Sequence, residues 1–178
     1  MPNPFAVVRF LLVLTVVMFV LTVVSMVRAR ADAPPKFSQY AAGEAYRGPI
    51  AKPKINGRKD PGLQRAYRKA EKTKVNAAGR YVLLKEFCGS ACVLGQLLDA
   101  RNGKIIRMPF TISGWRETED NFESIVTRPN SRLIVFRGSR DEEGINGVHY
   151  YTLEADGTFK HLVSVDTEGN FEKPLVID

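Results

Sequence analysis

The sequence predicts an α+β fold. An N-terminal membrane or signal helix precedes one small domain, which has a short basic amphipathic helix and a mainly antiparallel, meandering β-sheet. Three observations predict it: an uncharged apolar run over 10–27, a helical apolar pattern from residue 61, and strand-like segments with turn signals from residue 80. The hydrophobic fraction of 44% and the charged fraction of 25% are typical of a globular protein, which excludes a disordered body.

The apolar run 10–27 follows Arg9 and precedes Arg28 and Arg30. Signal-peptide cores have about 7–15 apolar residues and a spanning helix needs about 20, so this run lies between the two classes. Ala31-x-Ala33 matches the small-residue pattern that signal peptidase cleaves. We therefore expect export, with residues 1–33 as a signal peptide or a signal anchor. The domain is then either inner membrane-anchored and periplasmic, or periplasmic after cleavage.

The next segment, 34–60, is rich in Pro, Gly and Lys and is predicted to be a linker. The positive charge of the chain lies mainly in 52–80, which carries a net +8, whereas 81–178 carries −4. Such a basic segment attracts anionic partners. Because an exported protein rarely meets nucleic acid, we expect an envelope protein or anionic lipid head groups as the partner, in addition to the membrane itself, and no nucleic acid.

A helix is predicted to begin at Pro61, which suits the first helical position, with Asp60 as its cap. This helix opens the single domain, 61–178. One apolar face is expected from Leu63, Ala66, Tyr67 and Ala70, which follow helical spacing. The basic residues that remain for the solvent face are Arg65, Arg68, Lys69 and Lys72.

About five or six strands are expected after the helix. "RYVLLKEF" at 80–87 is one, and "CVLGQLLDA" and "KIIRMPF" form a hairpin in which Asn102-Gly103 suits a type I′ turn. "RLIVFRG" at 132–138 is a further strand, and a second hairpin turns at Asp156-Gly157. The polar stretch 115–130 is interpreted as a short helix or a loop, and "NFEKPLVID" at the end as an edge strand.

The two cysteines, Cys88 and Cys92, admit four interpretations: a structural disulfide, a redox pair, a metal clamp, or the surroundings of a nucleophilic Ser90. A disulfide needs Cα atoms about 4.4–6.8 Å apart, so the chain must turn between them, which the small residues at 89–91 permit. The C-x-x-x-C spacing differs from the C-x-x-C of redox motifs, and Ser90 does not lie in a G-x-S-x-G elbow. We therefore favour a disulfide that fixes the shape of a loop.

Only two histidines, His149 and His161, are available as imidazole ligands. With the turn at Asp156-Gly157, His149 is expected opposite Ser164 and His161 opposite Thr152. The two rings would then lie roughly 10–13 Å apart by strand rise, too far to share an ion. No metal and no cofactor is predicted, and each histidine is interpreted as a half-buried sheet residue.

The segment from Asn76 to Pro109 resembles a family of uncharacterised exported bacterial proteins. The shared pattern is Asn-x-Ala-Gly-x-Tyr, then Cys-Gly-x-x-Cys, then Asp-Ala-x-x-Gly-Lys, and here it falls on Asn76, Ala78, Gly79, Tyr81, Cys88, Gly89, Cys92, Asp99, Ala100, Gly103 and Lys104. The chain departs from the family at Ala77, where the family has Phe, and at Arg80, where it has His. The resemblance implies an envelope location and implies no activity.

These observations favour a non-catalytic, membrane-tethered periplasmic interaction module with a disulfide-stapled loop, because no set of His, Asp, Ser or Cys has the spacing of a catalytic site. An exposed aromatic or basic patch is expected beside the loop. The alternatives are a periplasmic enzyme with a site near 88–92, or a subunit of a larger membrane assembly. The candidate binding residues are Arg65, Arg68, Lys69, Lys72, Tyr81, Trp115 and His149.

Overall fold

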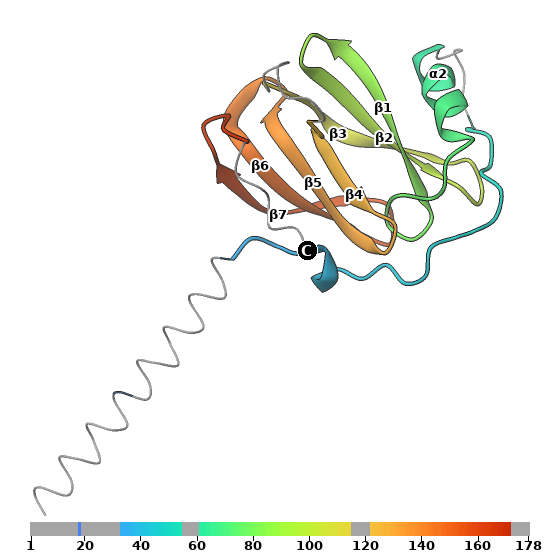
Figure 1. Cartoon of the computed structure of the whole chain (residues 1–178), viewed down its shortest axis with the longest axis horizontal. Coiled ribbons are helices and arrows are strands. Elements are labelled where there is room, and N and C mark those ends of the chain that lie inside the picture. The colour runs from blue at the N-terminus through green and yellow to red at the C-terminus, as the bar shows by residue number, and fades with distance from the viewer. Residues whose placement is uncertain (1–17, 19–32, 55–60, 115–121, 172–178) are drawn as a thin grey trace, which may run out of the picture. The chain divides into compact units, whose positions relative to one another are not determined.

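The computed structural model describes residues 18, 33–54, 61–114 and 122–171, and the chain divides into the units Met1–Pro34 and Pro35–Asp178. Among the described residues, none forms a helix long and apolar enough to cross a membrane. The apolar run 10–27, except Met18, lies outside them, as do Trp115 and the predicted edge strand beyond Phe171. The elements of the second unit (Figure 1) are η1 Phe37–Gln39, α2 Pro61–Ala70, β1 Tyr81–Gly89, β2 Cys92–Asp99, β3 Ile105–Ser113, β4 Ile125–Arg128, β5 Ser131–Arg140, β6 Glu143–Leu153 and β7 Phe159–Asp166.

The described strands form one antiparallel sheet in the order β1-β2-β3-β5-β6-β7, and β4 pairs with β5. The meander predicted from the sequence is confirmed, with short hairpins joining most neighbours. β5 joins strands β1–β3 to strands β6 and β7. Its last residues, Ser139 and Arg140, pair with β3, whereas its first part pairs with β4. The polar stretch 115–130 was predicted as a short helix or loop, but its end forms β4. This strand is too short and polar to be recognised from periodicity alone.

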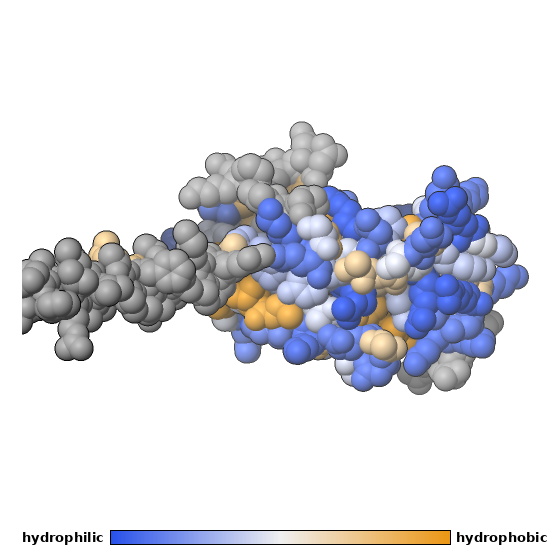
Figure 2. Space-filling view, turned by 90° about the horizontal axis from the view of Figure 1, so that it is seen from below, coloured by the Kyte–Doolittle hydropathy of each residue, from blue (hydrophilic) through white to orange (hydrophobic). Residues whose placement is uncertain are grey.

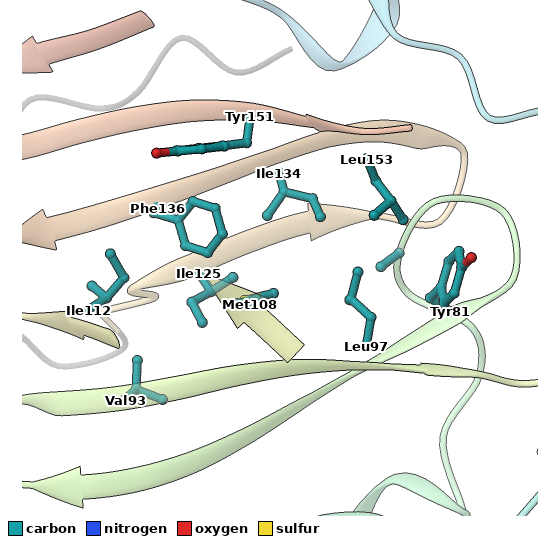
Figure 3. Close-up of a cluster of buried hydrophobic side chains, with 11 residues drawn as sticks. Tyr81, Val93, Leu97, Met108, Ile112, Ile125, Ile134, Phe136, Tyr151 and Leu153 are labelled. Atoms are coloured by element: carbon teal, nitrogen blue, oxygen red, sulfur yellow. The ribbon is translucent and has the colours of Figure 1, made fainter. Parts of the chain in front are cut away.

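The main core lies between β2 and β3 on one side and β5 and β6 on the other (Figure 3). Val93 and Leu97 of β2 point toward Phe136 of β5 and Tyr151 of β6. β2 is buried along nearly its whole length, since the core covers one face and α2 with its neighbours covers the other. This two-sided burial explains its almost continuous apolar sequence.

Helix α2 packs against the outer face of the β1–β2 hairpin. Leu63 and Ala70 are buried there, and Ala66 and Tyr67 pack against the same cluster. The apolar face predicted from the i, i+3, i+4 and i+7 spacing is therefore confirmed. The helix is held in place by this packing, because ten residues are too few for a stable isolated helix in water.

Residues 35–54, which we call the strap, lie along the end of the domain where β1 begins. The sequence predicts a linker here, but the strap belongs to the same compact unit as the sheet. Its backbone forms hydrogen bonds from Tyr46 to Gly79 (2.7 Å), from Ala51 to Ala100 (2.9 Å) and from Lys54 to Gly103 (2.7 Å). Phe37 is buried in a second core on the outer face of β5 and β6. Figure 2 shows the strap side as mostly hydrophilic, with hydrophobic residues in small groups.

Two turns differ from the prediction. The turn at Asn102-Gly103 is not type I′, because among the two residues only Gly103 has a positive φ; the Asp99 carbonyl instead accepts hydrogen bonds from both N–H groups. A turn with the type I′ signature occurs at Asp141 and Glu142, with φ values of 51° and 65°. The sequence predicted a loop there, since it lacks the usual Asn-Gly or Asp-Gly.

Candidate interaction site at the stapled hairpin

The cysteines form a disulfide at the tip of the β1–β2 hairpin, with 5.2 Å between their Cα atoms. Phe87 pairs with Val93, and Gly89 pairs with Cys92, so Cys88 is the extra residue of a bulge. A two-residue turn of Ser90 and Ala91 closes the hairpin. The structural disulfide favoured from the sequence is therefore confirmed. Once the cysteines are joined, residues 88–92 contain no titratable side chain.

Phe87 is the most exposed large hydrophobic residue described, with 78% of its surface open to solvent. It lies next to Cys88 near the end of β1, which is an edge strand of the sheet. Its strand partner Val93 is fully buried, so the hairpin is packed into the main core next to the tip. Sequence reasoning predicted an aromatic residue beside the loop but did not select Phe87, because the β1 pattern alone does not show where the core ends.

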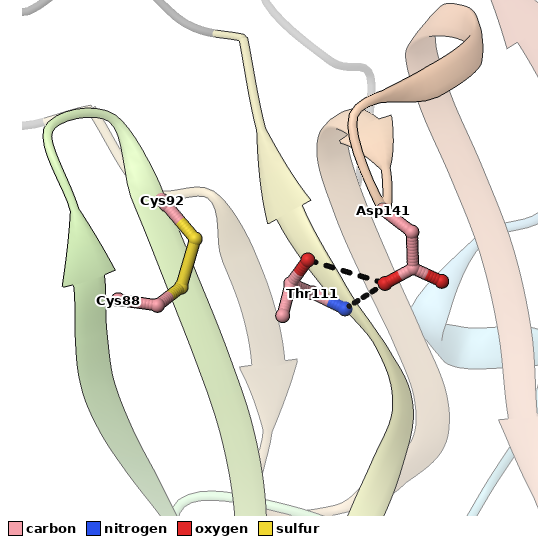
Figure 4. The surroundings of a disulfide bond; sticks show 4 residues. All are labelled: Cys88, Cys92, Thr111 and Asp141. Atoms are coloured by element: carbon pink, nitrogen blue, oxygen red, sulfur yellow. Dashed lines mark hydrogen bonds between the residues drawn. A yellow bond between two sulfur atoms is a disulfide. The ribbon is translucent and has the colours of Figure 1, made fainter.

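The neighbouring hairpin between β5 and β6 is fixed to the same end of the domain (Figure 4). Asp141 Oδ1 accepts hydrogen bonds from the Thr111 backbone N–H (2.8 Å) and hydroxyl (3.2 Å), and its own N–H donates to the Thr111 carbonyl. Thr111 pairs with Leu94, two positions from Cys92. These contacts position the two hairpin tips relative to each other.

The disulfide-linked tip of the β1–β2 hairpin, residues 87–92, is called the stapled tip. It lies at the opposite end of β1 from the strap. All strap hydrogen bonds named above, and those between Tyr40 and Arg132 and between Ala42 and Asn130, are made at the end where β1 begins. β1 has nine residues, which span roughly 26 Å at the usual strand rise. The tip therefore projects away from the place where the chain enters the domain (Figure 1).

His149, a candidate binding residue, is fully buried, and both ring nitrogens have partners. Nε2 lies 2.9 Å from the Gly138 carbonyl, which can only accept, so Nε2 carries the hydrogen. Nδ1 lies 2.7 Å from Ser164 Oγ. Burial is the main cause that lowers the pKa of His149 below its ordinary value. His149 is therefore a core residue whose two ring nitrogens both have hydrogen-bond partners, and no part of its ring is exposed to a ligand.

The second histidine, His161, lies nearer to His149 than the sequence predicted. His149 pairs with Ser164 as expected, but His161 pairs with Tyr151 and not with Thr152. His161 Nε2 is 2.9 Å from the same Ser164 Oγ that contacts His149, so the predicted separation of ten or more ångströms is wrong. No group of three or more His, Cys, Asp or Glu side chains suited to a metal ion occurs in the described part of the chain.

The other candidate residues lie on elements other than the tip, although the start of α2 approaches β1 next to it, since Gly62 lies close to the Glu86 side chain. Arg65, Arg68 and Lys69 are exposed on α2, and Lys72 is exposed just after it, as predicted for a solvent face. Tyr81 is buried at the opposite end of β1, where it accepts a hydrogen bond from Arg80 (2.9 Å).

Two cavities lie at the strap end of the domain. One, of about 320 Å³, is bordered by residues 78–81 and by the end of β6. The other, of about 550 Å³, lies between strap residues 45–50 and residues 73–75 after α2. Neither touches the stapled tip, so the enzyme alternative, which requires a concave site near 88–92, gains no support from them.

No family model matches the chain, and no match was found among curated proteins or among solved structures. The candidate site therefore stands on its geometry alone.

Proposed function

We propose that this protein is a non-catalytic interaction module of the bacterial envelope, tethered to a membrane through residues 10–27, which presents the stapled β1–β2 tip to a protein partner. The observation that carries the proposal is the 78% exposure of Phe87 beside a disulfide. Aromatic residues, Phe among them, are enriched in the buried centres of protein interfaces.

The disulfide supports binding because it limits the shapes that the loop can adopt before contact. A loop that is already ordered loses less conformational entropy when it binds, so more of the interaction energy appears as affinity. Phe87 is paired with the buried Val93, which fixes the position of its backbone at the end of β1. We expect the partner to offer an apolar pocket for the Phe87 ring.

The position of the tip leaves Phe87 accessible to a protein partner. The strap enters at the beginning of β1 and the tip lies at its end. Phe87 therefore lies at the end of the domain opposite the strap, where a partner can reach it without contacting the strap.

Site-specific photo-crosslinking in the producing cells tests this proposal. A benzophenone amino acid replaces Phe87 in the full-length chain, and the same amino acid replaces Val165 as the control. Val165 is also apolar and 41% exposed, but it lies on the edge strand β7. We expect one discrete protein adduct at position 87 that is absent at position 165.

Two further results decide the interpretation. Adduct formation at position 87 should fall several-fold in the background Cys88→Ser/Cys92→Ala, because the loop is no longer fixed. Identical adducts at both positions, a lipid adduct only, or none at position 87 would refute a protein partner at the tip. The purified Phe87→Ala variant should unfold at the same denaturant concentration as the parent, which separates a binding defect from a folding defect.

A further inference from the structure

The smaller cavity at the strap end is lined by three arginines from separate parts of the chain: Arg80 before β1, Arg101 in the β2–β3 turn, and Arg132 in β5. Tyr81 and Leu153, which lie at the same end of the main core (Figure 3), also line it. Arginine is the residue best suited to bind planar oxyanions, because its guanidinium group donates in a fixed fork and never loses its charge.

A buried carboxylate positions two of these arginines. Asp99 is only 4% exposed, and its Oδ2 lies 3.2 Å from Arg80 Nε. Its Oδ1 accepts a hydrogen bond from the Arg101 backbone N–H at 2.9 Å. Asp99 thus fixes the Arg80 side chain and the turn that carries Arg101, while leaving guanidinium donors of both free to meet a ligand.

The remaining contacts of the three side chains are weak or engage only part of each group. Arg80 donates one hydrogen bond to the Tyr81 hydroxyl. Arg132 Nη1 lies 3.5 Å from Glu154 Oε2, the long end of the range for an ion pair, and both side chains are more than a third exposed. Arg101 stacks over the Tyr46 ring, and in the described part of the chain it has no ion pair.

The charge balance of the lining favours a singly charged ligand. The three arginines are balanced by three carboxylates, Glu44 and Glu154 in the lining and Asp99 paired with Arg80. A doubly charged phosphate would be repelled by these carboxylates, whereas a singly charged carboxylate can pair with Arg101, which has no ion pair in the described part of the chain. The volume of about 320 Å³ is at the lower end for small-molecule sites, and apolar groups such as Leu153 can cover the body of a ligand.

We propose that this cavity binds a small organic molecule through its carboxylate group, with Arg80, Arg101 and Arg132 as the recognising residues. The site lies at the other end of β1 from Phe87 and is independent of the tip. A ligand here would contact the strap at Glu44 and Ala42, so its binding would also stabilise the strap against the sheet.

A matched pair of probes tests the proposal: N-acetylglycine, which carries one carboxylate, and N-acetylglycinamide, which has nearly the same shape but no charge. Each is titrated into the full-length protein in detergent micelles at constant ionic strength, and the arginine Nε–Hε signals are followed by NMR. We expect N-acetylglycine to shift the signals of Arg80, Arg101 and Arg132 saturably, with a Kd of about 1 mM. The amide should cause no saturable shift.

Two charge-matched variants complete the test. Arg101→Gln should weaken N-acetylglycine binding about tenfold, as the loss of a charge-assisted hydrogen bond predicts. Arg65→Gln, which removes the same charge from the exposed face of α2, should leave binding unchanged. Equal weakening by both variants, equal binding of both probes, or no saturable shift would overturn the proposal. Saturable binding of inorganic phosphate in place of N-acetylglycine would overturn the assignment to carboxylates.

Discussion

His161 Nε2 lies 2.9 Å from Ser164 Oγ, although the two residues are three positions apart in β7. In a regular strand they would point to opposite faces of the sheet. Here Val163 pairs with Tyr150 and His161 pairs with Tyr151, so Leu162 is an extra residue that reverses the alternation. The bulge thereby joins an exposed histidine through one hydroxyl to the buried His149.

We predict that the domain loses stability as the pH falls from 7.5 to 5. His149 has a lowered pKa in the folded state, chiefly because it is buried, with a smaller contribution from the nearby charge of Arg140. The unfolded chain therefore binds the proton more readily below about pH 6.5, which favours unfolding. Urea unfolding at several pH values measures this. The same slope should persist in His161→Gln, and a flat profile between pH 7.5 and 5 would contradict the prediction.

Loss of the disulfide should destabilise the domain by about 2 kcal/mol, because a loop this short contributes little chain entropy. The measurement compares the free energy of unfolding of the parent with that of Cys88→Ser/Cys92→Ala. A reductant should lower the stability of the parent and leave the variant unchanged. A loss well above 4 kcal/mol would mean that the bond supports the core and not merely the tip.

Gly138→Ala should destabilise the domain by about 1–3 kcal/mol or more. Gly138 has a φ of 138°, and an added Cβ would collide with the backbone carbonyl of Ser113 on β3. Gly144→Ala is the matched control, since that glycine also has a positive φ but an added Cβ meets nothing within 4 Å. Equal losses in the two variants would show that backbone strain, and not the close approach of β3 and β5, dominates.

Ser131→Ala should loosen the strap. The buried Ser131 hydroxyl lies 2.8 Å from the Phe37 carbonyl and 3.1 Å from the Tyr40 carbonyl. Its removal leaves buried acceptors with fewer partners, at a cost of about 1–3 kcal/mol. Hydrogen exchange of strap amides such as Tyr46 should accelerate, while amides in β2 keep their protection. Ser90→Ala, at the exposed tip, should change neither.

Much of the fold could be predicted because local patterns and tertiary packing agree. The helical spacing of Leu63 and Ala70 matches the face that packs on β1, and the closeness of Cys88 and Cys92 permits only a tight turn. The strap could not be predicted, because its Pro and Gly content is that of a linker. Its attachment depends on the side chain of Phe37 and on carbonyls of turns distant in sequence.

The candidate sites were harder to predict than the fold. Phe87 follows a strand pattern, and only its place near the end of the edge strand β1 shows that it is left in solvent. Arg80, Arg101 and Arg132 share no motif, and only the pairing of β1 with β2 and the approach of β5 bring them to one cavity. His161 was misplaced for a similar reason, since a single bulge changes the register of every residue beyond it.

The strap also defines how the domain would respond to mechanical load. A pull at its N-terminal end would reach the hydrogen bonds near Ser131 first, then those at Gly79, Ala100 and Gly103 in turn. Bonds loaded one at a time yield at lower force than the sheet, where many share the load. The strap would therefore detach from the sheet first and release roughly 65 Å of extended chain, while the β1–β2 hairpin stays folded.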